Sequence, residues 1–217
     1  MGRKVWFAFA AVLLGASSAQ SEPVTFRFDG TVTGAHGLEG NLAAGQGFSV
    51  LATWDTARPG FDLSGGLTDY DRAYDRLELS IGSHTYTLNR PNAGVSHLHV
   101  FDDYPGRDDS LSMYLELGYG WFDGPQLTDR RLSPWYFELL LSFPDAAWDS
   151  TAPPSALPAT PTFSRGAVYW TDPDQRQPIA GRGDVSITSV HKIPEPATLT
   201  LLALGAGAAF MLRRRRR

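Results

Sequence analysis

The 217-residue chain contains no cysteine. This absence excludes disulfides, catalytic thiols, cysteine-ligated zinc and iron–sulfur clusters. Without disulfides, a folded domain of this chain would be stabilised by its core alone, even if it were exported. The central part also lacks any stretch with the 3.6-residue apolar period of a long helix. What the chain does have is a distinctive segment at each end and a central part that favours β structure.

The first 19 residues have the pattern of a secretory signal peptide. Arg3 and Lys4 supply the positive start, residues 5–15 are apolar, and residues 16–19 are the small residues that a signal peptidase requires. We predict cleavage between Ala19 and Gln20 and export of the chain that follows.

The last residues form three different pieces in series. Pro194, Glu195 and Pro196 make a stiff, extended tripeptide, because proline fixes φ and donates no hydrogen bond. Residues 197–212 are uncharged and mostly apolar, and the chain ends in Arg213, Arg214, Arg215, Arg216 and Arg217. A transmembrane helix over 197–212 would be about 24 Å long, shorter than the roughly 30 Å hydrocarbon core. Such a marginal span favours a temporary anchor, and the arginines would stay on the cytoplasmic side.

This order of motif, apolar run and arginine cluster resembles the C-terminal sorting signal of PEP-CTERM proteins, the substrates of exosortase. The resemblance implies an inner-membrane intermediate that exosortase cuts near the Pro-Glu-Pro motif and passes to the cell surface or the extracellular matrix. Signal peptidase and exosortase would be processing partners, and residues 197–212 a transient membrane contact. The alternative is a tail that stays as a permanent membrane anchor.

Without its two ends the chain is distinctly acidic. Residues 20–192 hold 12 basic and 22 acidic side chains, a net charge of −10. Nucleic acid and anionic membrane surfaces are poor partners for such a domain. We therefore divide the chain into a signal peptide (1–19), an exported domain (20–192) and a sorting signal (193–217).

The exported domain is predicted to be all-β, a jelly-roll-like β-sandwich of eight to ten strands. Apolar alternation is typical of half-buried strands, and Gly82-Ser83 should form a hairpin turn. Residues 150–161, with four prolines, should form an extended loop. The expected strands are 24–32, 47–54, 77–81, 84–88, 95–101, 111–117, 135–143, 163–170 and 184–190.

Two groups of residues are candidate metal ligands. Closely spaced carboxylates in a loop can bind calcium, and they occur at Asp102, Asp103, Asp108 and Asp109, with a second group at Asp69, Asp71 and Asp75. Neither has the spacing of an EF-hand, and solvated acidic loops are the alternative. His97 and His99 should share one face of a strand, where they could bind zinc or copper with His84 or His36 as further ligands. Exposed histidines without a metal are the other interpretation.

Glycan hydrolysis would need two carboxylates held across a cleft. Glu78, Glu116 and Glu138 are candidates, with Trp54, Trp121 or Trp135 as stacking platforms for sugar. No spacing singles out a pair, so we predict that the protein is not an enzyme. The favoured hypothesis is a structural or adhesive protein of an exopolysaccharide or biofilm matrix. A carbohydrate-binding module, a glycan-active enzyme and a permanently anchored binding protein are the alternatives.

Overall fold

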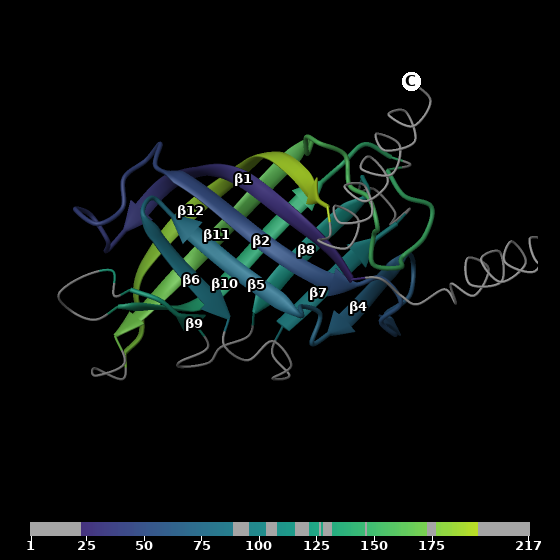
Figure 1. Cartoon of the computed structure of the whole chain (residues 1–217), viewed down its shortest axis with the longest axis horizontal. Helices are drawn as coiled ribbons and strands as arrows, with labels where there is room; N and C mark the ends of the chain where they lie inside the picture. Colours follow the sequence, from purple (N-terminus) through teal and green to yellow (C-terminus); the bar gives the residue numbers. More distant parts are fainter. Residues whose placement is uncertain are drawn as a thin grey trace, which may run out of the picture.

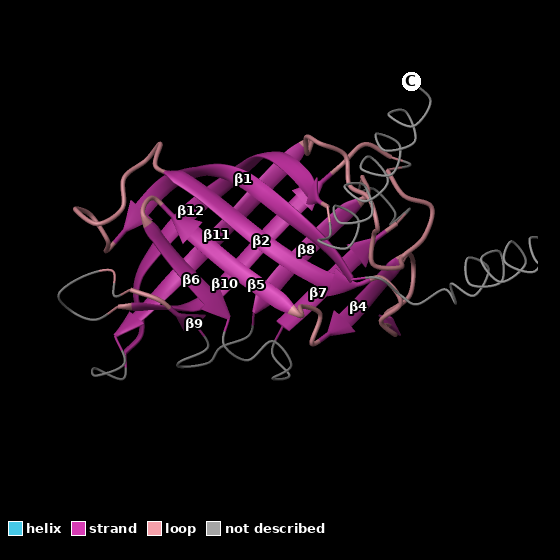
Figure 2. Cartoon of the chain, in the orientation of Figure 1, coloured by secondary structure: helices cyan, strands magenta, loops and turns pink. Residues whose placement is uncertain are grey.

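The computed structural model describes residues 23–88, 96–102, 108–115, 122–125, 127, 132–145, 147–172 and 177–194. Every regular element in these ranges is a β-strand (Figure 2). No helix among the described residues is long and apolar enough to cross a membrane. The predicted signal peptide, the transmembrane sorting helix and residues 195–217 of the sorting signal lie outside the described residues.

Twelve strands form one antiparallel sheet in the order β3-β4-β7-β8-β10-β11-β12-β1-β2-β5-β6-β9. All nine expected strands are present, and β3, β4 and β9 are additional. The hairpin at Gly82 is confirmed, since Ile81 pairs with His84 and Gly82 adopts φ 58°. The strands are β1 (Pro23–His36), β2 (Gly47–Asp55), β3 (Phe61–Asp62), β4 (Leu67–Asp71), β5 (Arg76–Ile81), β6 (His84–Leu88), β7 (Ser96–Phe101), β8 (Ser110–Leu115), β9 (Phe122–Asp123), β10 (Ser133–Ser142), β11 (Phe163–Asp172) and β12 (Gln177–Ile193).

The sheet curls over itself into a half-barrel, so that β1, β2, β5 and β6 cross in front of β8, β10 and β11 (Figure 1). The change of layer follows the long pair β1–β12, whose register shifts between Asp29 and Gly30 and again between Val32 and Gly34. Each shift is a bulge, and bulges bend a strand and increase its twist. The all-β class is confirmed. The prediction of a two-sheet sandwich is wrong, because β12 and β1 keep both layers in one hydrogen-bonded sheet.

The core lies between the two layers and is built mainly by alternation along the strands, most regularly in β2, β5 and β10. Phe26 and Trp54 come from the front layer and stack with ring centroids 4.9 Å apart. Phe137 and Trp170 face them from the back layer and are fully buried. The side chains between these positions point outward, so each layer has an outer face that is available for other contacts.

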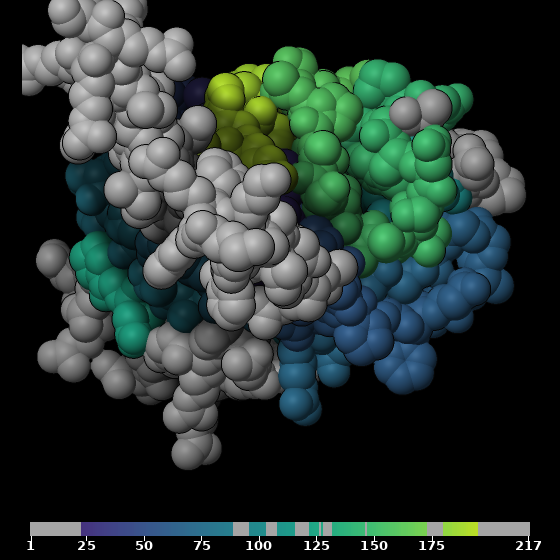
Figure 3. Space-filling model, turned by 45° about the vertical axis from the view of Figure 1, so that its right-hand side comes forward, coloured from purple at the N-terminus to yellow at the C-terminus, as the bar shows by residue number. Residues whose placement is uncertain are grey.

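The proline-rich loop between β10 and β11 packs on one end of the curled sheet. The indole Nε1 of Trp54 donates to the carbonyl of Pro154 (3.1 Å), and the hydroxyl of Tyr70 donates to the carbonyl of Thr151 (2.7 Å). In Figure 3 the loop, in green, lies against the part of the chain before residue 75, in blue. Residues 150–161 form the predicted loop, and the strands that follow it pair within the same sheet.

The bulge at Gly30 provides a test of the bend. A Cβ at position 30 would lie 1.9 Å from the carbonyl oxygen of Ser186, a backbone atom of β12 that cannot move aside alone. We expect Gly30→Ala to lower the free energy of unfolding by about 2 kcal/mol or more, measured by urea denaturation.

Gly47→Ala is the matched control, since Gly47 lies on the adjacent strand and a Cβ there would meet no atom within 4 Å. This variant should stay within about 0.5 kcal/mol of the parent protein. Equal stability of the two variants would contradict the assigned role of the bulge.

Candidate functional site

The outer face of the back layer carries half-buried polar and aromatic side chains on six neighbouring strands, β4, β7, β8, β10, β11 and β12. Two groups of side chains stand out on it. We call the first, formed by Asp69, His97 and His99, the Asp–His cluster. We call the second, around Glu138 and Arg165, the Glu138 hollow.

Strand register assembles the Asp–His cluster. Leu98 and Val100 of β7 point into the core, so His97 and His99 point outward. Asp69 of β4 is the direct partner of His99. Its Oδ1 lies 3.2 Å from Nδ1 of His97 and 3.2 Å from Nε2 of His99. The three side chains keep 14 to 21% of their surface exposed, so the cluster is sheltered but accessible from outside.

Two tyrosines hold the histidines in place. The ring of Tyr114 stacks on His97 with centroids 4.7 Å apart, and its hydroxyl lies 3.2 Å from Nε2 of His99. On the core side, the buried hydroxyl of Tyr74 donates to the backbone carbonyl of His97 (2.7 Å). Burial lowers the pKa of His99, although the nearby carboxylate of Asp69 opposes this effect. The imidazole of His99 is therefore neutral at neutral pH, the form that binds a metal.

The prediction that His97 and His99 share one face is confirmed, but the expected further ligands are wrong. Nε2 of His36 pairs with Asp184 (3.1 Å), and His84 belongs to β6 in the front layer. Asp69 is the third member of the cluster instead. From the sequence, Asp69 was assigned to an acidic group. That it lies beside the two histidines follows only from the pairing of β4 with β7, which the sequence does not show.

The carboxylates of the predicted acidic groups point to different partners. Asp75 pairs with Arg58 (2.9 Å) and Asp71 lies 3.9 Å from Arg72, so neither joins Asp69. In the other group, Asp109 is buried, and its Oδ2 accepts hydrogen bonds from the amides of Ala147 (2.7 Å) and Trp148 (3.3 Å). Asp108 is exposed, Asp102 follows β7, and Asp103 lies outside the described residues. Calcium binding at Asp102, Asp103, Asp108 and Asp109 stays a prediction, with one oxygen of Asp109 already engaged.

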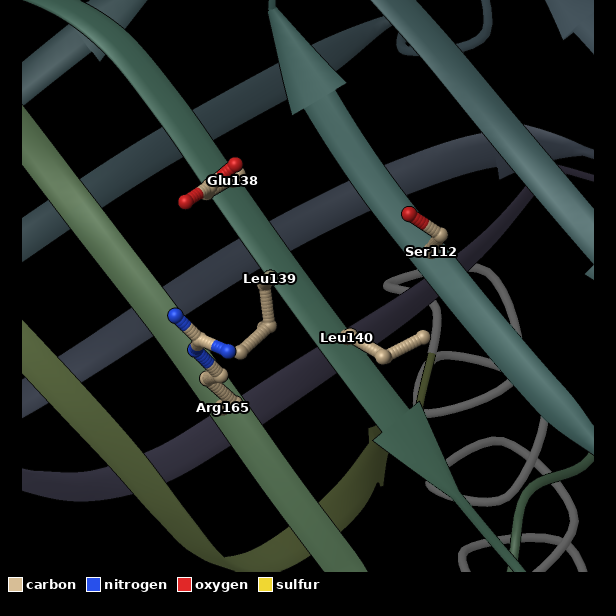
Figure 4. Close-up of a pocket in the computed structure, with 5 residues that line it drawn as sticks. All are labelled: Ser112, Glu138, Leu139, Leu140 and Arg165. Carbon is tan, nitrogen blue, oxygen red and sulfur yellow. The ribbon is translucent and has the colours of Figure 1, made fainter.

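The Glu138 hollow is an open depression of about 350 Å³ on the same outer face. Figure 4 shows Glu138 and Leu140 of β10 between Ser112 of β8 and Arg165 of β11. Its lining is Ser112, Glu138, Leu139, Leu140 and Arg165.

Two tyrosine hydroxyls fix the carboxylate of Glu138. Tyr136 donates to Oε2 (3.1 Å) and Tyr169 donates to Oε1 (3.3 Å). Burial, followed by the negative charge of Glu138, raises the pKa of Tyr136 far above its usual value. Both hydroxyls therefore stay protonated and continue to donate. The guanidinium of Arg182 lies over the ring of Tyr169, 5.2 Å from its centroid.

The structure does not bring the predicted glutamates together. Glu78 lies on β5, ion-paired with Arg76 (2.7 Å), and four strands separate β5 from β10 in the sheet. Glu78 and Glu138 thus face outward from opposite layers and cannot act across one cleft. Trp54 and Trp135 are buried at 1% and 9% exposure, so neither is a surface platform for sugar. Glu116 and Trp121 lie outside the described residues.

Comparison with known proteins identifies the tail. Residues 192–217 match the family model described as the PEP-CTERM protein-sorting motif. A C-terminal signal of this class implies export and transit through the membrane. The chain is a PEP-CTERM protein, as Pro194, Glu195 and Pro196 together with the arginine cluster predict, and its motif implies processing by exosortase. No curated protein and no solved structure matches the chain.

The contacts of Asp109 predict a structural role for its carboxylate. Asp109→Ala would remove this acceptor from the amides of Ala147 and Trp148, although the Ala147 amide also donates to the carbonyl of Pro144 (3.1 Å). We expect the variant to lower the free energy of unfolding by about 2 kcal/mol. Urea denaturation would measure the loss. Asp108→Ala is the control, because this neighbouring side chain is exposed, and it should change stability by less than about 0.5 kcal/mol. A neutral Asp109→Ala variant would be inconsistent with this role.

Proposed function

We propose that this exported PEP-CTERM protein binds a neutral polysaccharide of the cell surface or extracellular matrix through the Glu138 hollow, and has an adhesive role in the matrix. The observation that carries the proposal is the carboxylate of Glu138, which two tyrosine hydroxyls orient at an open hollow beside Arg165.

The lining of the hollow suits a ligand rich in hydroxyl groups. Glu138 accepts hydrogen bonds, Arg165 donates them, and Ser112 does both. Leu140 and the rings of Tyr136 and Tyr169 add apolar surface beside these polar groups. Ligand sites combine apolar surface with polar groups that set orientation, and in the Glu138 hollow the polar side chains form the larger part of the lining.

Charge favours a neutral polysaccharide over an anionic one. The exported part of the chain has a net charge of −10, and a like-charged polymer would be repelled at low ionic strength. Glu138 adds a negative charge within the hollow itself. An uncharged, hydroxyl-bearing polymer experiences no such repulsion.

Binding without hydrolysis is part of the proposal. Glycosidases use two carboxylates, about 5 to 9.5 Å apart, on either side of the scissile bond. Glu138 is the one carboxylate among the described residues that line the hollow. The hollow therefore supports a binding site better than a catalytic one.

In the proposed pathway, sorting brings the Glu138 hollow to the outside of the cell. Signal peptidase cuts between Ala19 and Gln20, residues 197–212 hold the chain in the inner membrane, and exosortase then cuts near Pro194, Glu195 and Pro196. The product is a matrix or surface protein without its arginine cluster. The motif match at residues 192–217 supports this sequence of events.

A test of glycan binding compares two glutamates on opposite layers. Glu138→Ala removes the oriented acceptor, so we expect at least a tenfold loss of affinity for neutral polysaccharide, about 1.4 kcal/mol, measured by affinity electrophoresis. Glu78→Ala is the matched control, because Glu78 is also a strand glutamate that faces outward. Glu78 pairs with an arginine, and the affinity of this variant for the polysaccharide should be unchanged. Equal affinities of the two variants, or release of reducing ends from the bound polysaccharide, would contradict the proposal.

The sorting step has its own test. Mass spectrometry of the surface-exposed protein should find a chain that starts at Gln20 and lacks residues 197–217. Replacement of Pro194, Glu195 and Pro196 by alanine should leave the full tail attached and the protein in the membrane fraction. An intact tail on the surface form of the unaltered protein would favour the permanently anchored alternative.

A further inference from the structure

We propose that the Asp–His cluster is a zinc site, in which Oδ1 of Asp69, Nδ1 of His97 and Nε2 of His99 ligate one ion that ties the short strand β4 to β7. This site is separate from the Glu138 hollow, and its existence does not depend on glycan binding.

Two of the three pairs of ligand atoms have the spacing that tetrahedral zinc requires. Two ligands at about 2.0 to 2.1 Å from a tetrahedral zinc ion lie about 3.3 Å apart. Oδ1 of Asp69 lies 3.2 Å from each histidine nitrogen, and all three atoms lie within 4.8 Å of one another. Asp69 and His99 are direct partners in the pairing of β4 with β7, so the ligands meet in the existing strand register.

The donor set distinguishes zinc from calcium. Two imidazole nitrogens and one carboxylate oxygen are borderline ligands of the kind that zinc prefers, whereas calcium takes six to eight oxygens. The described residues place no arginine or lysine within ion-pairing distance of Asp69. The negative charge of Asp69 thus faces two imidazoles, a combination of donors that favours a metal cation.

The surroundings hold the ligands in position. Tyr114 stacks on His97, and Tyr74 anchors the backbone of His97 from the core side. The Tyr114 hydroxyl, 3.2 Å from Nε2 of His99, provides an oxygen beside the site. Outer contacts of this kind orient metal ligands and increase affinity.

The ion would have a structural effect at the end of the sheet. β4 has five residues, and beyond it lies only β3, which has two. A metal bound across β4 and β7 stabilises their pairing, because a ligand that binds only the folded state increases its stability.

The test uses the full chain, stripped of metal with a chelator and titrated with zinc by calorimetry. We expect one ion per chain and a higher thermal midpoint with zinc than with chelator. His97→Gln, His99→Gln and Asp69→Asn should each weaken binding by about 100-fold or more. His36→Gln is the matched control, since this histidine contacts Asp184 of β12, which β8, β10 and β11 separate from β7 in the sheet. The zinc affinity of this variant should not change.

A second measurement needs no variant. Bound zinc should protect His97 and His99 of the unaltered protein from chemical modification, read by mass spectrometry, and leave His36 reactive. Any of three results would overturn the proposal: no stoichiometric zinc binding, undiminished affinity in all three ligand variants, or equal modification of His97 and His99 with and without zinc.

Discussion

The structure depends on the pairing of β1 with β12. β1 and β12 are 14 and 17 residues long, and residues 25–36 pair with residues 182–193. The bulges in this pairing bend the sheet where one layer passes into the other. Gly30 permits the close approach, since a side chain there would meet the backbone of β12. One continuous sheet thereby encloses a core without disulfides, and the pairing of β1 with β12 resumes after each register shift.

Both candidate sites follow from the same alternation that builds this core. β7, β8 and β10 alternate buried and half-buried side chains over most of their length, so the half-buried ones meet in rows across the outer face. The row through His97, Tyr114 and Glu138 links the Asp–His cluster to the Glu138 hollow by direct cross-strand partners. The PEP-CTERM motif indicates export, and the outer face is where an exported domain of this shape offers chemistry to its surroundings.

The sequence was sufficient for features that are local. A strand with one buried face shows a period of two, which is why nine strands were predicted, and the tail is a linear motif whose parts lie in order. β4 was missed because its inward positions are Thr68 and Tyr70, which give a weak apolar signal. The position of Asp69 was missed with it. Tyr136, Glu138 and Tyr169 come together through register between strands, and no local pattern encodes which strands are neighbours.

The order of strands also constrains when the domain can become whole. Residues 23–172 supply two separate groups of neighbouring strands. In sheet order, one group is β1-β2-β5-β6-β9 and the other is β3-β4-β7-β8-β10-β11, and β12 lies between them. β12 is the last strand of the described residues and ends at Ile193, directly before the Pro-Glu-Pro motif. In the export that this motif implies, the two halves would be joined only when the sorting signal had reached the bilayer. Completion of the sheet and arrival at the sorting enzyme would then be one event in time.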